Sequence, residues 1–272
     1  MAVEWVDRVG EQLETDRFGR ALRGFEEVDS TNVQARAWAQ DGAEEGSVVV
    51  ADYQTHGRGR HGRVWTADRG QNLMLSTVLR PSLAPDALGL VTVAAGVAVA
   101  EAVDAFAGTH RADIKWPNDV LLEGRKTCGM LLEGSVTGGG SRATPPDFVI
   151  LGIGLNVNQV HFPEALTETA TSLRLVAGRS VPRVPLLAHL LRRLEHRYDQ
   201  VQAGQDAEVR RRFTERMPRL GDDVILRATG SNQTVAGRVR GITSTGGLRL
   251  ATPSGEQVVH AGEVTTARRS SR

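Results

Sequence analysis

The spacing of apolar residues divides the chain into a long first part and a short second part. Runs of β-branched and apolar residues predict buried strands, while apolar residues at helical spacing predict helices. The expected strands of the first part cover 47–53, 72–79, 112–116, 120–122, 127–133 and 148–157. The expected helices cover 3–24, a stretch from about 31 to 38, 86–107, 184–202 and 206–217. This succession favours an α+β fold, a mixed sheet with helices on one side.

The second part begins after Pro218, where the pattern changes to short alternating strands. They cover 224–227, 235–240, 248–251 and 257–260, separated by Gly, Ser and Asn turns, which is typical of a small β-barrel. The division expected from these patterns is a helical extension over 1–25, a main domain over 26–219, a β domain over 220–266 and a disordered tail over 267–272. Residues 137–146 have the composition of a flexible loop.

Composition and charge narrow the classes of protein that fit this pattern. The 272 residues carry a net charge of +1, with 40% hydrophobic and 24% charged residues, so no whole-surface attraction to nucleic acid or anionic membranes is expected. A single cysteine, Cys128, excludes an intramolecular disulfide. Residues 1–10 have no apolar run, which excludes a secretory signal. Glu101 interrupts the apolar segment 88–103, which we interpret as a buried helix of a cytoplasmic protein.

The segment 54–63 carries the strongest chemical signal. Three glycines and three arginines occur within the seven residues of 57–63. Glycine lets the backbone approach a ligand, and arginine supplies a planar fork of donors for phosphate and carboxylate oxygens, so the segment predicts a flexible anion clamp. Its G-x-G-x-x-G pattern does not predict a dinucleotide fold, because no helix and no acidic residue follow at the required spacing. A solvated basic loop that touches RNA stays open as an alternative.

Four further segments place polar groups at the ends of predicted elements. Residues 29–32 (DSTN) stand at a helix start, where Ser30 or Thr31 is expected to cap the helix. Residues 115–119 (KWPND) end a strand, and residues 125–131 (RKTCGML) begin another. Residues 152–158 form a glycine-containing strand end that a ligand can approach closely.

In this order and with these gaps, the five segments resemble the biotin protein ligase family. The resemblance covers roughly residues 26–265, and its most specific part is GRGR-x-GR followed by KWPND and K-x-x-G-[IM]-L. It implies a mixed-sheet catalytic domain related to lipoate ligases, and a C-terminal domain similar to an SH3 barrel. It also implies a two-step reaction. Biotin and ATP give biotinyl-5′-adenylate and pyrophosphate, and a carrier lysine then takes the biotin and releases AMP.

The resemblance assigns roles to individual positions. Arg58, Arg60 and Lys126 would be catalytic, because two anions have to be brought together and their charge neutralised. The positions implied for biotin are Ser30, Thr31, Asn32, Gln54, Arg58, Gly59, Arg60, Lys126, Gly129 and Gly152. Those implied for ATP or the adenylate are Arg60, Arg63, Trp65, Lys115, Asn118 and Asn156, with Asp119 as a ligand for Mg²⁺.

Several of these positions also have plain structural explanations. Lys126 would be a turn lysine, Trp65 would belong to the core instead of stacking on adenine, and Asp119 would be structural. We interpret Trp116 and Cys128 as packed core side chains without a catalytic role.

The implied partner is the biotin carboxyl carrier domain of biotin-dependent carboxylases. The enzyme would be a monomer or a homodimer, with neither nucleic acid nor membrane involved. Only about 25 residues precede the segment 29–32, too few for the winged helix-turn-helix domain of bifunctional family members, so we expect no operon repression. Two other functions stay open: a lipoate ligase or acyl transferase on the same core, and a non-enzymatic RNA-binding module whose binding would weaken steeply with salt.

Overall fold

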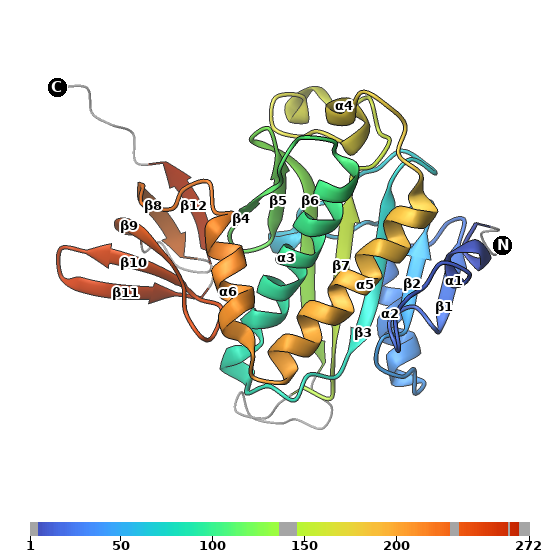
Figure 1. Cartoon of the computed structure of the whole chain (residues 1–272), viewed down its shortest axis with the longest axis horizontal. Coiled ribbons are helices and arrows are strands. Elements are labelled where there is room, and N and C mark those ends of the chain that lie inside the picture. Colours follow the sequence, from blue (N-terminus) through green and yellow to red (C-terminus); the bar gives the residue numbers. More distant parts are fainter. Residues whose placement is uncertain (1–4, 136–145, 229–233, 261, 267–272) are drawn as a thin grey trace.

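The strands of the protein form two sheets (Figure 1). The computed structural model describes residues 5–135, 146–228, 234–260 and 262–266. The larger sheet consists, in spatial order, of β1 Leu22–Phe25, β2 Val48–Ala51, β3 Leu73–Leu79, β7 Phe148–Leu155, β6 Arg125–Ser135, β5 Asp119–Leu122 and β4 Asp113–Lys115. β1 and β2 pair in parallel and the other neighbours in this sheet are antiparallel. The predicted mixed sheet is confirmed.

Helices cover both faces of the larger sheet. They are α1 Asp7–Gly10, α2 Thr31–Gln40, α3 Gly89–Phe106, α4 Leu173–Ala177, α5 Arg183–Gln202 and α6 Asp206–Glu215, with 3₁₀ turns at Arg60–Gly62, Pro85–Ala87 and Glu164–Leu166. In β2, Val48 and Val50 belong to the core under α3 and α5, whereas Val49 packs in a second cluster with Ala35 and Ala39 of α2. The prediction of helices on one side is therefore wrong, because α2 has a small apolar face of its own and buries it on the opposite side.

The helix α3 is the apolar segment that we interpreted as buried. Within the described residues, Pro85–Phe106 is the one stretch long and apolar enough to cross a membrane. It packs instead against the sheet, α5 and α6, with most of its side chains buried. Gly96 permits the close approach, since a Cβ there would lie 3.2 Å from the Phe213 ring and 3.3 Å from Ile114. The interpretation as a core helix is confirmed.

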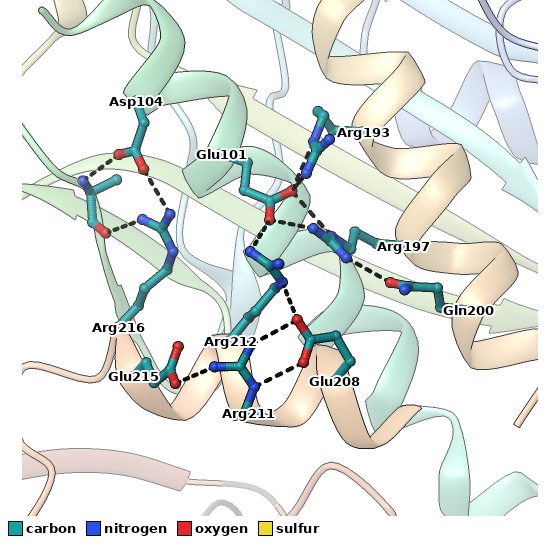
Figure 2. Close-up of polar contacts among 11 residues, drawn as sticks. Glu101, Asp104, Arg193, Arg197, Gln200, Glu208, Arg211, Arg212, Glu215 and Arg216 are labelled. Carbon is teal, nitrogen blue, oxygen red and sulfur yellow. Dashed lines mark hydrogen bonds and ion pairs between the residues drawn. The ribbon is translucent and has the colours of Figure 1, made fainter. Parts of the chain in front are cut away.

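A charged network ties together the three helices on this face (Figure 2). Glu101 of α3 has a side chain that is only 9% exposed, and it accepts hydrogen bonds from Arg193 and Arg197 of α5. Arg212 of α6 lies 3.5 Å from the same carboxylate. Arg197 is also buried, at 4% exposure. The network therefore lies between the helices and contributes to how they pack.

The N-terminal region differs from its prediction. The periodicity predicts a helix over 3–24, but the described part of this region holds only the four-residue α1 and then β1, which pairs with β2. Glycine weakens a helix interior, and Gly10 ends α1, while Gly19 has a φ of +80° that no helix accommodates. The apolar residues are buried separately: Phe18, for example, packs against Tyr198 of α5 at a ring distance of 5.6 Å.

The second sheet is antiparallel and follows α6. In spatial order it consists of β11 Gly255–Val259, β10 Leu248–Thr252, β9 Thr234–Ile242, β8 Asp223–Ala228 and β12 Gly262–Thr266. The sequence pattern predicts four of these strands and misses β12, because residues 262–266 (GEVTT) contain no alternating apolar run. The predicted flexible loop, except for residue 146, and the predicted tail over 267–272 lie outside the described residues.

Candidate active site

Two adjoining cavities lie beside the larger sheet. Both are open to solvent, and their volumes are about 50 Å³ for the smaller and about 520 Å³ for the larger. The residues that line both are Gly59, Arg60, Trp65, Asn118 and Lys126. We call these five residues the shared wall, and residues 57–65, which contribute three of them, the flap.

The flap is a short hairpin whose shape depends on glycine. The Gly59 N–H donates to the Arg63 carbonyl at 2.8 Å, and the Trp65 N–H donates to the Gly57 carbonyl at 3.0 Å. A Cβ at position 57 would collide with the Trp65 carbonyl oxygen, so no other residue fits there without moving the backbone. The hairpin places the arginines of the segment beside the two cavities.

Each of the three predicted catalytic cations contacts a side-chain oxygen of another residue. The pairs are Arg58 with Glu133 at 3.4 Å, Arg60 with Asn118 at 2.9 Å and Lys126 with Asp119 at 2.8 Å. The side chains of Arg58 and Lys126 are 52% and 36% exposed. Ion pairs with this exposure are weak, and each cation has further donors, so an anionic ligand can compete for them.

The floor of the smaller cavity holds connected polar side chains. Ser76 Oγ lies 2.7 Å from Thr31 Oγ1 and 2.6 Å from Asn32 Oδ1. Gln54 Oε1 accepts from the Thr31 N–H at 2.7 Å and from the Thr31 hydroxyl at 3.0 Å. Ser30 occupies the N-cap position of α2 but makes no side-chain capping bond. The predicted N-cap position is confirmed for Ser30, but the capping bond of its side chain is absent. Gln54, from a distant loop, accepts from the first backbone N–H of the helix.

Ser76 was not among the residues predicted from the sequence. Its signal is a polar residue, fully buried at the centre of an apolar strand, because such a group needs a hydrogen-bond partner. The apolar residues that line the smaller cavity were also missed; they are Leu75, Met130, Leu131 and Ile153. Nothing in their identity separates them from ordinary core residues, so only the folded arrangement shows them.

Three glycines of β6 and β7 make room for side chains of the site. A Cβ on Gly152 would overlap with Asn32 Oδ1, and a Cβ on Gly154 would lie 2.5 Å from the Trp65 indole. A Cβ on Gly129 would lie 3.1 Å from the same indole. Trp65 therefore lies against two glycines in the cavity lining and is not a core residue. Its Nε1 is buried, with no hydrogen-bond partner in the described part of the chain.

The structure gathers the predicted positions into the two cavities. All ten positions predicted for biotin line the smaller cavity, and all six predicted for the nucleotide line the larger one, as does Asp119. Asn156 is only 4% exposed, and its amide already donates to the Thr171 carbonyl at 3.0 Å. Its contribution to the lining is therefore mainly one of shape.

The larger cavity also has lining residues that the sequence analysis did not predict. Among them are Phe162, Leu166, Glu168, Thr169 and Ala170 of the loop after β7, and Gly262 of β12. The loop is held there by the Lys126 N–H, which donates to the Thr169 carbonyl at 2.7 Å. Gly262 shows that the second sheet reaches the site. The loop after β7 and strand β12 are both distant in sequence from the other residues of the cavity. No local sequence pattern therefore indicates that they line it.

Two interpretations from the sequence are confirmed. Trp116 is 3% exposed, and its Nε1 donates to the Gly246 carbonyl at 3.1 Å, so it is packed in the core, where it also borders the larger cavity. Cys128 is fully buried, and burial raises the pKa of its thiol far above the ordinary value, so it is a packed core side chain. Within the described residues, no group of three or more His, Cys, Asp and Glu side chains is placed to hold a metal ion.

Known proteins match this chain in sequence and in structure. The biotin/lipoate A/B protein ligase family model matches residues 24–155, and the biotin protein ligase C-terminal domain model matches residues 220–265. The bifunctional ligase/repressor BirA of Bacillus subtilis is 35% identical over 254 residues, 93% of this chain and 76% of that protein. The biotin–[acetyl-CoA-carboxylase] ligase of Mycobacterium tuberculosis is 35% identical over 249 residues, 90% of this chain and 88% of that protein.

Among solved structures, the biotin protein ligase from Aquifex aeolicus in complex with biotin and ATP is similar to this chain. Its TM-score is 0.76 at 29% identity, covering 90% of this chain and 98% of that one. Fold and matches agree on the class of protein, an ATP-dependent ligase with the fold shared by biotin and lipoate ligases. Within that class, the chain belongs to the biotin protein ligase family.

Proposed function

We propose that this protein activates biotin with ATP and transfers the biotinyl group to a lysine of a biotin carboxyl carrier domain. The observation that carries the proposal is the shared wall, since Arg60, Asn118 and Lys126 line both cavities. Two anions that enter the cavities from either side would meet at positive charge. In an RNA-binding loop, the arginines would point to solvent. Arg58 and Arg60 line the smaller cavity instead, which argues against the RNA-binding alternative.

In the first step, a carboxylate oxygen of biotin attacks the α-phosphorus of ATP, forms the new O–P bond and expels pyrophosphate. Arg58, Arg60 and Lys126 would offset the repulsion between the reactants and stabilise the charge that develops on the phosphate oxygens. Lys115, which lines the larger cavity, would bind the outer phosphates. The Trp65 ring would stack on the adenine, a contact worth about 1–3 kcal/mol per base.

The smaller cavity offers both kinds of surface that biotin requires. The polar floor formed by Thr31, Asn32, Gln54 and Ser76 would hydrogen-bond the ureido group, with Ser30 at its edge. Apolar side chains of β6 and β7 line the same cavity and would pack against the hydrocarbon parts. A few oriented polar groups in an apolar cavity are the usual arrangement for recognition of a small ligand.

In the second step, the neutral ε-amine of the carrier lysine attacks the carbonyl carbon of the adenylate. The new C–N bond forms, the C–O bond to the phosphate breaks, AMP leaves and the amine loses a proton. No covalent enzyme intermediate is required. We propose that this reaction takes place in the cytoplasm, and because one chain lines both cavities, a monomer or a homodimer would serve equally.

Magnesium would enter with the nucleotide. The carboxylates that line the larger cavity are Asp119 and Glu168. Two carboxylates, one of which lies 2.8 Å from Lys126, are too few to enclose a metal ion with protein ligands alone. This donor set fits an ion that keeps several waters and is held mainly by phosphates. Asp119 would then be its protein ligand, and the ion would neutralise phosphate charge.

The test is to incubate the purified protein with biotin, ATP, Mg²⁺ and a biotin carrier domain, and then to weigh the carrier. We expect a mass gain of one biotinyl group that requires ATP and disappears when the target lysine of the carrier is replaced by arginine. A parallel reaction with lipoate separates the two activities of this fold. An unmodified carrier, or one that accepts lipoate and not biotin, would contradict the proposal.

A further inference from the structure

Glu133 of β6 lies just beyond the edge of the smaller cavity. Side chains alternate between the two faces of a strand, so Gly129, Leu131 and Glu133 face the same side of the sheet. Gly129 and Leu131 line the smaller cavity. Glu133, the next residue on that face, does not line it but contacts two residues that do. A carboxylate in this position has to be explained, because the proposed substrate is itself an anion.

One oxygen of this carboxylate fixes Asn32 in the cavity floor. Glu133 Oε2 accepts a hydrogen bond from Asn32 Nδ2 at 2.7 Å, and Asn32 Oδ1 lies 2.6 Å from Ser76 Oγ. An ionised carboxylate can only accept, so the nitrogen of the Asn32 amide has to face Glu133 and its oxygen has to face Ser76. Asn32 is only 4% exposed, so water can hardly replace Glu133 as the acceptor for its amide nitrogen. Glu133 thereby determines the orientation of an amide in the floor.

The other oxygen holds Arg58 of the flap. Glu133 Oε1 lies 3.4 Å from the guanidinium nitrogen NH1 of Arg58, whose side chain is 52% exposed, whereas that of Glu133 is 20% exposed. A guanidinium has five N–H donors, so Arg58 can contact Glu133 and still donate to a second carboxylate. An arginine on an exposed hairpin loses considerable side-chain freedom when it binds a ligand. An ion pair that already restricts it reduces that loss.

We propose that Glu133 is a positioning residue for the activation of biotin. It holds Arg58 at the mouth of the smaller cavity and orients the Asn32 amide in its floor, so that a single carboxylate connects the flap to the polar floor. The inference rests on the proposed function and deepens it. Glu133 touches no reacting atom in this account and acts only through Arg58 and Asn32.

The substitution Glu133→Gln separates the two contacts. Glutamine keeps a carbonyl oxygen for Asn32 Nδ2 but has no charge for Arg58. We expect the KM for biotin in the pyrophosphate-release assay to rise roughly three- to fivefold, the upper range for a half-exposed ion pair, while kcat and the KM for ATP stay near wild type. Glu256→Gln is the matched control, because it removes a glutamate–arginine pair, that with Arg249, on the second sheet.

A double-mutant cycle with Arg58→Ala distinguishes positioning from a general effect on β6. If Glu133 acts through Arg58, then Glu133→Gln raises the KM for biotin no further once Arg58 is absent. An equal increase in both backgrounds, or a Glu133→Gln variant with wild-type KM, would overturn the inference. Thermal melting checks that each variant is folded. Should Glu133→Gln fail to fold, Glu133→Asp enters the same cycle, since it keeps the charge but shortens its reach.

The same assay separates failure of this inference from failure of the proposed function. A wild-type protein that releases no pyrophosphate from biotin and ATP contradicts the proposed function, and the role of Glu133 with it. An active wild type together with an unaffected Glu133→Gln variant contradicts the role of Glu133 alone.

Discussion

Among single residues, Lys126 is the one on which biotin activation should depend most directly. Its ammonium lines both cavities. We expect Lys126→Ala to reduce pyrophosphate release roughly a hundred- to a thousandfold, the usual effect of removing one group that stabilises transition-state charge. Thermal stability should change little, because the side chain is 36% exposed. Arg125→Ala, at the neighbouring position, is the control, and normal pyrophosphate release from Lys126→Ala would refute its role.

Arg60 should control how long the adenylate stays bound. It lines both cavities and donates to Asn118 Oδ1 at 2.9 Å. Arg60→Gly should leave a folded protein that loses biotinyl-5′-adenylate at least about tenfold faster, as expected for a charge-assisted hydrogen bond, and so labels other proteins promiscuously. Radiolabelled adenylate retention and mass spectrometry of a bystander protein measure this. Arg69→Gly, on an exposed loop, should behave as wild type. Undiminished retention by Arg60→Gly would show that the flap is wrongly assigned.

Gly152 should be required for the shape of the cavity floor. A methyl group there would occupy the position of Asn32 Oδ1, so Asn32 has to move and its contact with Ser76 is lost. We expect Gly152→Ala to weaken biotin binding roughly tenfold or more, since a buried polar group is left without its partner. Gly134→Ala in β6, three residue pairs away along the β6–β7 ladder and with ordinary contacts at 3.8 Å, is the control for calorimetry. Equal affinities would contradict this role.

Among the secondary-structure elements, α3, α5 and α6 depend on Glu101. Replacing it with glutamine removes the charged partner that Arg197, which is 4% exposed, has among the described residues. Removing one member of a buried ion pair costs about 3–5 kcal/mol, and we expect the low end for Glu101→Gln, because Arg193 and Arg212 reach solvent. Denaturant unfolding measures the change. Glu208→Gln of α6 should have little effect, because its side chain is 37% exposed and contacts Arg211 and Arg212 of the same helix (Figure 2). Equal stabilities of the two variants would contradict the prediction.

The same carboxylate gives stability a pH dependence. Burial works against ionisation of Glu101, but hydrogen bonds from Arg197 and Arg193 outweigh it, so its pKa lies below the ordinary 4.5. The folded protein therefore binds this proton more weakly than the unfolded chain does. Its contribution is complete above pH 4.5 and is lost as the pH falls through the lower, folded-state pKa. Melting temperatures below pH 4.5 should consequently fall less steeply for Glu101→Gln than for wild type.

The sequence predicts elements and motifs well where the signal is local. Apolar runs locate the strands of the larger sheet except β1, most of which falls in the segment predicted as a helix. The glycine–arginine segment locates the flap. Gly19 shows the limit for helices, because its positive φ breaks a pattern that reads as helical over 3–24. Ser76 shows the limit for the site, since it was not predicted and contacts Thr31 of α2 across 45 residues of sequence. Strand β12 has no apolar signal because its pairing with β8 defines it.

On the scale of the whole molecule, the second sheet completes the nucleotide cavity. Gly262 lines the larger cavity, whereas no described residue of that sheet lines the smaller one. The two parts meet where Trp116 donates to the Gly246 carbonyl and where Gly89, at the start of α3, approaches Thr245. The position of the second sheet should therefore affect ATP more than biotin.

Gly89→Ala tests this expectation. A Cβ on Gly89 would lie 2.8 Å from the Thr245 carbonyl oxygen, so the second sheet has to shift. We expect the KM for ATP to rise roughly tenfold, since small displacements of a positioning group have large effects, while the affinity for biotin stays near wild type. Gly10→Ala, where a Cβ meets no atom within 4 Å, is the control. Similar losses for both substrates would contradict this division of labour.

The shared wall also has a thermodynamic consequence. Gly59, Arg60, Trp65, Asn118 and Lys126 border both cavities, so a ligand that immobilises them on one side alters the free energy of binding on the other. Linkage requires this effect to be reciprocal. If bound vitamin changes the affinity for the nucleotide by some factor, bound nucleotide changes the affinity for the vitamin by the same factor. A substitution in these residues that strengthens the coupling would therefore raise the vitamin's affinity for the nucleotide-bound protein and the nucleotide's affinity for the vitamin-bound protein by the same factor.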